Sequence, residues 1–242
     1  MFNGKRKALT FSFDDGVLQD ERLIRIFNKY GLKSTFNINS GLLGQPGQLT
    51  INDKIVDHTK VQPKDVKKLY ARHEIAAHTL THPSLPEISD EEVIRQVEED
   101  RKALSVLAGY EVIGMAYPGG GVNNDERVAE LIRKNTKVAY ARTITSTFDF
   151  ALQDCLYRFN PTVHYWERKE LHELIKQFID LKPNKPALFY IWGHAYEFDI
   201  EDTWDEFEDI CIDLSGRDDI FYGTNREVFF HKVLGSPRVS YW

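Results

Sequence analysis

Stretches with strand character and stretches with helix character alternate along the whole of this 242-residue chain. Residues 8–13 alternate apolar and small polar side chains, which is typical of a strand with one buried face. Leu18 to Tyr30 has apolar residues at helical spacing and is followed by Gly31, a common helix end. Further strands are expected at 33–38, 74–77, 112–117, 138–141, 187–192 and 220–222, and further helices at 63–72, 89–109, 125–134, 168–181, 204–214 and from 224 or 225. This alternation predicts an α/β fold with mainly parallel strands.

No feature of the sequence divides the chain. It has no repeat, low-complexity stretch or linker, and its length is compatible with a single α/β barrel. Hydrophobic residues make up 42% of the chain and charged residues 28%, which is ordinary for a soluble globular protein. We therefore predict one domain, residues 1–242, built as an α/β barrel.

Charge and hydropathy argue against two classes of partner. The formal net charge is −6 and there is no basic block, so nucleic acid is not expected as a partner. No stretch approaches the roughly 18 consecutive apolar residues of a membrane helix. The apolar stretch after the basic N-terminus ends at Asp14 and is too short for a signal peptide. We expect a soluble, cytoplasmic protein, unless a leader was removed before Met1.

Two adjacent acids, Asp14 and Asp15, stand at the end of the first predicted strand, and Gly16 follows them. Adjacent carboxylates repel one another, so a fold gains nothing from this pair without a cation or a shared proton. Gly16 allows a sharp turn and the close approach of another group. The acid pair therefore predicts a functional site at this strand end.

Two histidines, His78 and His82, follow the predicted strand 74–77. Pro83 disfavours a helical conformation at His82, so we expect a tight turn here and not a helix. Alone, the HxxxH spacing fits structural histidines equally well. Two imidazoles together with a carboxylate from the acid pair make a three-ligand metal site of the open, catalytic kind. The other carboxylate would then be free to act as a base.

Other strand ends carry useful groups, and in such folds the chemistry gathers at the carboxyl ends of the strands. His194 follows strand 187–192 and suits a general acid, although a histidine bonded to a loop carbonyl is the alternative. The glycine-rich stretch with Pro118 and Gly119 could present backbone N–H groups to an oxyanion or be an ordinary turn. Arg142 ends another strand.

Several residues are candidates for contact with a substrate. Trp192 could stack on a sugar ring, although packing in the core is the commoner fate of an aromatic residue. His164 could line the site. The long stretch 40–61 is a candidate binding loop, in which His58 is expected to be solvated.

Taken together, these segments resemble the polysaccharide deacetylase family, which includes chitooligosaccharide and peptidoglycan deacetylases. The resemblance spans roughly residues 9–194 and rests on the segments TFSFDDG, HTLTHPSL and FYIWGHAYEFD. It implies a distorted β/α barrel and metal-dependent removal of N- or O-linked acetyl groups from carbohydrates. Matched by position, the catalytic base would be Asp14, the metal ligands Asp15, His78 and His82, and the general acid His194.

The implied cofactor is a divalent ion, for which zinc is expected and Co²⁺, Ni²⁺ or Mn²⁺ are alternatives. The backbone N–H of Gly119 would help to hold the oxyanion. The chain departs from the family pattern at Ala116, where the family has an arginine that orients the base. Arg142 could supply this guanidinium from the next strand. The family tyrosine after the proline is Gly119 here, and residues 143–149 replace the family's DxxDW-like segment.

Two other functions remain open at this point. An allantoinase-like hydrolase of a small cyclic amide would use the same fold and metal. A carbohydrate-binding relative without catalysis is suggested by Ala116. Metal content and acetate release would distinguish these alternatives.

Overall fold

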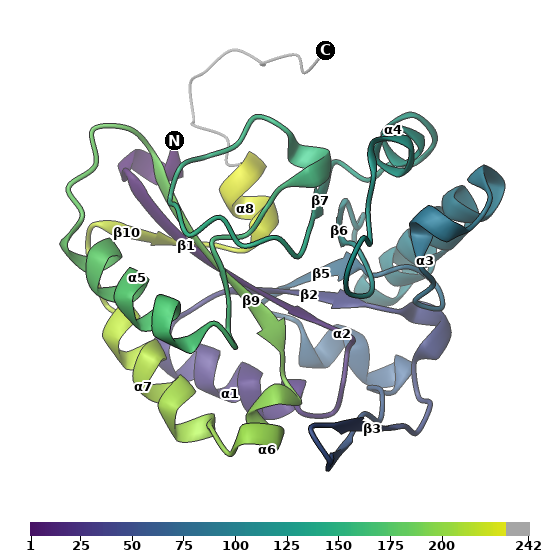
Figure 1. Ribbon diagram of the computed structural model, residues 1–242, viewed down its shortest axis with the longest axis horizontal. Coiled ribbons are helices and arrows are strands. Elements are labelled where there is room, and N and C mark those ends of the chain that lie inside the picture. Colours follow the sequence, from purple (N-terminus) through teal and green to yellow (C-terminus); the bar gives the residue numbers. More distant parts are fainter. Residues whose placement is uncertain (231–242) are drawn as a thin grey trace.

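A mainly parallel, curled sheet of eight strands forms the centre of the computed structural model, which describes residues 1–230 (Figure 1). The strands are β1 (Lys7–Asp14), β2 (Ser34–Ile38), β5 (Glu74–Ala77), β6 (Gly114–Ala116), β7 (Tyr140–Arg142), β8 (Val163–His164), β9 (Ala187–His194) and β10 (Ile220–Tyr222). They are ordered β7-β6-β5-β2-β1-β9-β8, and β10 pairs with β1. The predicted α/β class with mainly parallel strands is confirmed.

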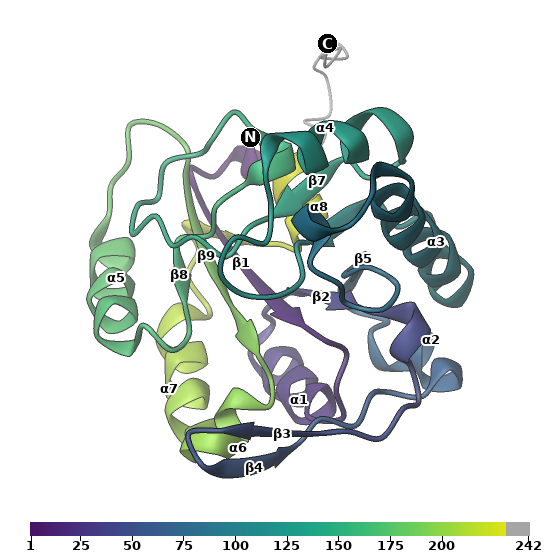
Figure 2. The same ribbon diagram turned by 45° about the vertical axis from the view of Figure 1, so that its right-hand side comes forward.

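Helices surround the sheet, and two groups of them pack side by side (Figures 1 and 2). Helices α1, α5 and α7 cover one flank, and α2, α3 and α4 cover another. The helices are α1 (Asp20–Tyr30), α2 (Val66–Leu69), α3 (Asp90–Ala108), α4 (Glu126–Asn135), α5 (Arg168–Asp180), α6 (Glu197–Glu201), α7 (Trp204–Leu214) and α8 (Asn225–Phe230). Short 3₁₀ helices lie at Phe2–Gly4, Ser40–Leu42, Pro63–Asp65, Leu85–Glu87 and Leu156–Arg158. Within residues 1–230, no helix has the length and apolar character needed to cross a membrane.

The curled sheet forms a half-barrel. Between its outer strands β7 and β8, a single parallel bridge joins Arg142 to Phe159, and the chain then continues into β8. The distorted barrel implied by the sequence resemblance is therefore the observed architecture. That the whole chain is one domain stays a prediction.

Strand β1 is buried on both faces, so the prediction that only one face is buried is wrong. One face carries Phe11 and Phe13, which contact Phe27 of α1 with ring centroids 4.8 and 5.9 Å apart. On the other face, the Ser12 hydroxyl accepts a hydrogen bond of 2.8 Å from Asn37. Small polar residues are tolerated there because buried partners satisfy their hydrogen-bonding groups.

The predicted loop 40–61 contains a β-hairpin, formed by β3 (Gln48–Ile51) and β4 (Lys54–Asp57). Its turn residues, Asn52 and Asp53, both have positive φ angles (50° and 62°), a conformation that suits short polar residues. The hairpin lies beside α6 at one end of the molecule (Figure 2).

Candidate active site

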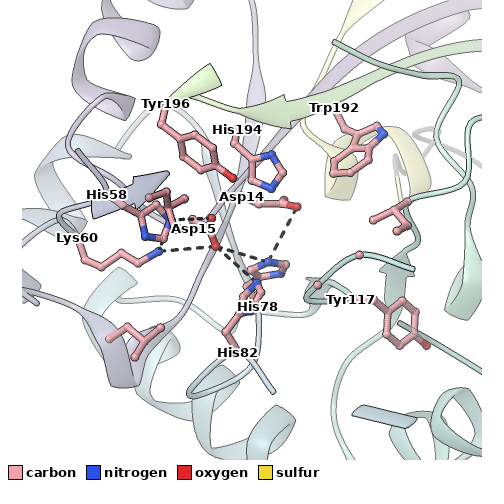
Figure 3. A pocket seen from close by; sticks show the side chains of 15 residues that line it. Asp14, Asp15, His58, Lys60, His78, His82, Tyr117, Trp192, His194 and Tyr196 are labelled. Atoms are coloured by element: carbon pink, nitrogen blue, oxygen red, sulfur yellow. Dashed lines mark hydrogen bonds and ion pairs between the residues drawn. The ribbon is translucent and has the colours of Figure 1, made fainter. Parts of the chain in front are cut away.

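A cavity of about 440 Å³ opens at the carboxyl ends of the strands (Figure 3). Residues from β1, β9, the turn after β5, the loop after β6 and the hairpin region line it together. The lining residues are Asp14, Asp15, Leu42, Leu49, His58, Lys60, His78, His82, Tyr117, Gly119, Gly120, Ile144, Trp192, His194 and Tyr196. The predicted convergence of the acid pair with His78, His82 and His194 is therefore observed.

Asp15 lies in a strained turn directly after β1. Its φ angle is 82°, and its N–H donates a 2.9 Å hydrogen bond to the carbonyl of Asn37. Gly16 follows with φ of 63°, and a Cβ atom there would lie 2.8 Å from Ile38 Cγ2. A non-glycine residue at positive φ costs of order 1–3 kcal/mol, and such strain is common at functional sites. The turn directs the Asp15 carboxylate into the cavity (Figure 3).

Two imidazoles face this carboxylate. His78 Nε2 lies 3.8 Å from Asp15 Oδ1, and His82 Nε2 lies 3.7 Å from the same oxygen. The segment between the histidines is a turn, as predicted, and His82 has a φ angle of 61°. Asp100 of α3 stabilises the start of this turn, because its carboxylate accepts the N–H of His78 at 2.9 Å.

The donor atoms of these three residues suit a divalent ion. Distances of 3.7 and 3.8 Å are too long for hydrogen bonds. They are close to the spacing expected for two ligands that each lie about 2.0–2.2 Å from one ion. His78 Nδ1 lies 2.9 Å from the Ala116 carbonyl, so Nδ1 carries the hydrogen and Nε2 keeps its lone pair. Burial lowers the pKa of His78 to about 4, so the ring is neutral near pH 7.

Asp14 forms a buried ion pair with Arg142. The guanidinium donates to Asp14 Oδ2, and Asn37 Nδ2 donates to Oδ1 at 2.8 Å. Burial raises the pKa of Asp14, but Arg142, His78 and His194 together outweigh this effect, and the pKa lies below its usual value. Asp14 is therefore ionised at neutral pH.

Arg142 occupies the position that we expected for the missing guanidinium. It is the register partner of Ala116 on the neighbouring strand, and position 116 is where the sequence resemblance implies an arginine. Arg142 is fully buried, and its guanidinium stacks 4.3 Å from the Trp192 ring centroid. Arg142 is not among the residues that line the cavity, and its guanidinium reaches the cavity only through its hydrogen bond to Asp14.

His194 is held by Glu197, a residue that the sequence reasoning missed. His194 Nδ1 donates to Glu197 Oε1 at 2.8 Å, and the His194 N–H donates to Oε2 at 3.2 Å. Burial lowers the pKa of His194, but Glu197, with smaller contributions from Asp15 and Asp14, raises it to about 9. Burial likewise opposes ionisation of Glu197, yet His194 and His164 lower its pKa to about 2. The imidazole is therefore cationic at neutral pH, with Nε2–H as its remaining donor.

Gly193 makes this pairing possible. A Cβ atom at that position would lie 2.9 Å from Glu197 Oε2. Glu197 follows His194 by three residues in the segment GHAYE, and this spacing could have identified Glu197 as the partner of His194.

His164 and Pro118 are not among the residues that line the cavity, whereas Gly119 and Trp192 are. His164 lies behind Trp192, with ring centroids 4.2 Å apart, and its Nε2 is 3.2 Å from Glu197 Oε1. His164 therefore lies outside the lining of this cavity, and its contact with a substrate stays a prediction. His164, His194 and Glu197 also bring three potential metal donors together. Their contacts of 2.8 and 3.2 Å are those of hydrogen bonds.

The expectation that His58 is solvated is wrong. His58 Nε2 lies 3.0 Å from Asp15 Oδ2, and its ring packs edge-on against Tyr196. Backbone hydrogen bonds of 2.9 and 3.0 Å join residues 58–61 to residues 16–18 and bring His58 to the acid pair. Lys60, from the same segment, also lies beside Asp15. Burial raises the pKa of Asp15, but His58 and Lys60 hold it well below its usual value.

Comparison with known proteins gives matches to deacetylases. A family model described as polysaccharide deacetylase matches residues 3–138. A chitooligosaccharide deacetylase from Rhizobium leguminosarum bv. phaseoli is 27% identical over 118 residues, which are 48% of this chain but only 42% of that protein. The peptidoglycan deacetylase PdaC from Bacillus subtilis has a TM-score of 0.55 at 18% identity, covering 92% of this chain and 90% of that one. A family 4 carbohydrate esterase from Streptomyces lividans, in complex with acetate, has a TM-score of 0.55 at 13% identity, covering 87% and 88%. At such identities the two structures support the fold.

Proposed function

The chain belongs to the polysaccharide deacetylase family, and on this premise we propose that it hydrolyses acetyl groups from an acetylated carbohydrate. The observation that carries the proposal is that Asp14, His194 and the group formed by Asp15, His78 and His82 line one cavity. The acetyl group is N- or O-linked in this proposal. Cleavage of an N-acetyl group leaves an amine, whereas cleavage of an O-acetyl group leaves an alcohol.

Asp15, His78 and His82 would hold the metal ion, for which their nitrogen and oxygen donors suit zinc. When bound, a divalent ion lowers the pKa of a water ligand and polarises a carbonyl group. Neutral His78 supports this assignment, because a protonated imidazole has no lone pair to donate.

Asp14 acts as the general base in this proposal. Its ionised carboxylate lines the cavity beside the predicted ligands, with His78 Nε2 4.0 Å from Oδ2. The bonds from Arg142 and Asn37 hold the carboxylate in one orientation, so little reorganisation is needed when it accepts the proton of water.

His194 donates the proton that the leaving group requires. It is cationic before the reaction because Glu197 stabilises the charge, and it lines the same cavity as Asp14. The backbone N–H of Gly119, in the loop after β6, contributes to stabilising the oxyanion. Acetate and the deacetylated sugar then leave.

The test is Asp14→Asn, assayed by acetate release from acetylated oligosaccharides together with zinc content. We expect a loss of about two to four orders of magnitude in kcat with zinc retained. Asp154→Asn, an exposed substitution with the same change in charge, should remain fully active. Full activity of Asp14→Asn with zinc bound would refute the assignment of the base.

A further inference from the structure

A buried lysine stands in the wall of the cavity, and the catalytic scheme does not use it. The Lys60 side chain is only 6% exposed. Its Nζ lies 3.6 Å from Asp15 Oδ1 and 3.3 Å from His58 Nε2, on the side of Asp15 away from His78 (Figure 3). A buried ammonium group normally has oxygen acceptors at hydrogen-bond distance.

Neither neighbour is a good acceptor for Lys60. His58 Nε2 also lies 3.0 Å from Asp15 Oδ2, and this bond to an ionised carboxylate requires the hydrogen on Nε2. An N–H group cannot accept a hydrogen bond from an ammonium. The distance of 3.6 Å to Asp15 Oδ1 exceeds a normal hydrogen bond. Within residues 1–230, the Lys60 ammonium therefore has no oxygen acceptor at hydrogen-bond distance.

The charges around the cavity leave Lys60 as the cation without a dedicated partner. Arg142 is paired with Asp14, and His194 is paired with Glu197. Asp15 is the nearest carboxylate to Lys60, Asp20 and Asp14 act on its charge at longer range, and Asp15 is also the carboxylate of the proposed metal site. A divalent ion held there would leave the cavity with an excess of two positive charges, which favours an anionic ligand.

We propose that Lys60 binds a carboxylate group of the ligand that enters this cavity. The proposal rests on the function proposed above and extends it to the class of ligand. A carboxylate oxygen would give the ammonium a charge-assisted hydrogen bond in place of the missing acceptor. The carboxylate is either released acetate or an acidic group on the sugar, and the two sources can be separated experimentally.

The first experiment compares acetate with acetamide, its neutral counterpart, in calorimetric titrations of the zinc-loaded protein. Wild-type protein should bind acetate at least about tenfold more tightly than acetamide. Lys60→Met should weaken acetate binding about tenfold and leave acetamide binding unchanged, while Lys60→Arg should restore most of the acetate affinity. Lys102→Met, at an exposed position on α3, controls for the loss of one charge and should behave as wild type. Unchanged acetate binding by Lys60→Met would overturn the proposal.

If Lys60→Met does not fold, as judged by circular dichroism, Lys60→Gln makes the same comparison with a polar neutral side chain. The wild-type protein also provides a test by itself. Equal binding of acetate and acetamide by wild-type protein would overturn the proposal without any variant.

The second experiment identifies the source of the carboxylate. KM is measured for an N-acetylated oligosaccharide with neutral rings and for one with a carboxylate on each repeating unit. If the sugar carries the carboxylate, Lys60→Met should raise KM about tenfold for the acidic substrate alone. If acetate is the ligand, both KM values should stay constant and only inhibition by acetate should weaken. No acetate release from any oligosaccharide by wild-type protein would refute the proposed function, while the acetate and acetamide titrations would still test Lys60.

Discussion

Replacing Glu197 by Gln should convert His194 from a cation into a neutral imidazole at the pH of a normal assay. Glu197 is the main reason that the pKa of His194 is about 9, since burial alone lowers it. If the variant pKa falls to the unperturbed value of about 6.5, the protonated fraction at pH 8 drops from about 90% to about 3%. A reaction that needs the protonated form of His194 should then slow about 30-fold at pH 8 and less than twofold at pH 6.

The assay is the pH profile of kcat for acetate release, together with an NMR titration of the His194 ring nitrogens. The basic limb of the profile should move from about pH 9 in wild type toward pH 6.5 in the variant. Glu173→Gln, an exposed substitution on α5, should leave the profile unchanged. A basic limb that stays near pH 9 in Glu197→Gln would refute the conclusion that Glu197 raises the pKa of His194.

The same pair makes a prediction for stability. The folded-state pKa of His194 is raised, so its stabilising contribution is fully present below pH 6.5 and is lost as the pH rises through 9. A shift from 6.5 to about 9 corresponds to about 3 kcal/mol. The free energy of unfolding of wild type, measured with urea, should fall by this order between pH 6.5 and 9. Glu197→Gln should lack this decrease, and an equal decrease in both proteins would contradict the interpretation.

Three further predictions concern the neighbouring residues. Arg142→Met leaves the Asp14 carboxylate buried without its partner and should lower the free energy of unfolding by about 3–5 kcal/mol. The measurement is a urea titration, and an unchanged unfolding midpoint would contradict the role of the buried ion pair. Removal of metal with a chelator should abolish acetate release, and added zinc should restore it. His82→Ala should not regain activity at the same zinc concentration. Acetate release that survives chelation would refute metal dependence. His58→Ala removes the hydrogen bond that orients Asp15 and should weaken zinc binding about tenfold in calorimetry, whereas equal affinity would show that His58 does not position this ligand.

The sequence predicted most of the sheet and its helices because apolar periodicity reflects burial directly. The helix expected at 89–109, for example, is α3, and the Ser89 side chain accepts the N–H of Glu92 at its start. The hairpin in 40–61 was missed because its strands are only four residues long and largely exposed. Short strands of this kind have little periodic signal.

Within the candidate site, the residues that end long strands could be placed from the sequence alone. Asp14 and His194 end neighbouring parallel strands in register, so the topology brings them to one edge of the sheet. The contacts of His58 and Glu197 could not be derived in this way. His58 reaches Asp15 through long-range pairing of irregular backbone, and the bonds of Glu197 depend on the turn that follows β9. Neither arrangement leaves a periodic pattern in the chain.

The register of β6 and β7 has a consequence for recognising relatives of this chain. Ala116 and Arg142 are opposite one another on adjacent strands, and the guanidinium still meets the Asp14 carboxylate. An arginine on the strand next to position 116 can thus reach the Asp14 carboxylate. A sequence motif that requires arginine at position 116 would miss this chain, although its Asp14 carboxylate is paired with Arg142. Searches for related proteins should therefore also consider an arginine on the neighbouring strand.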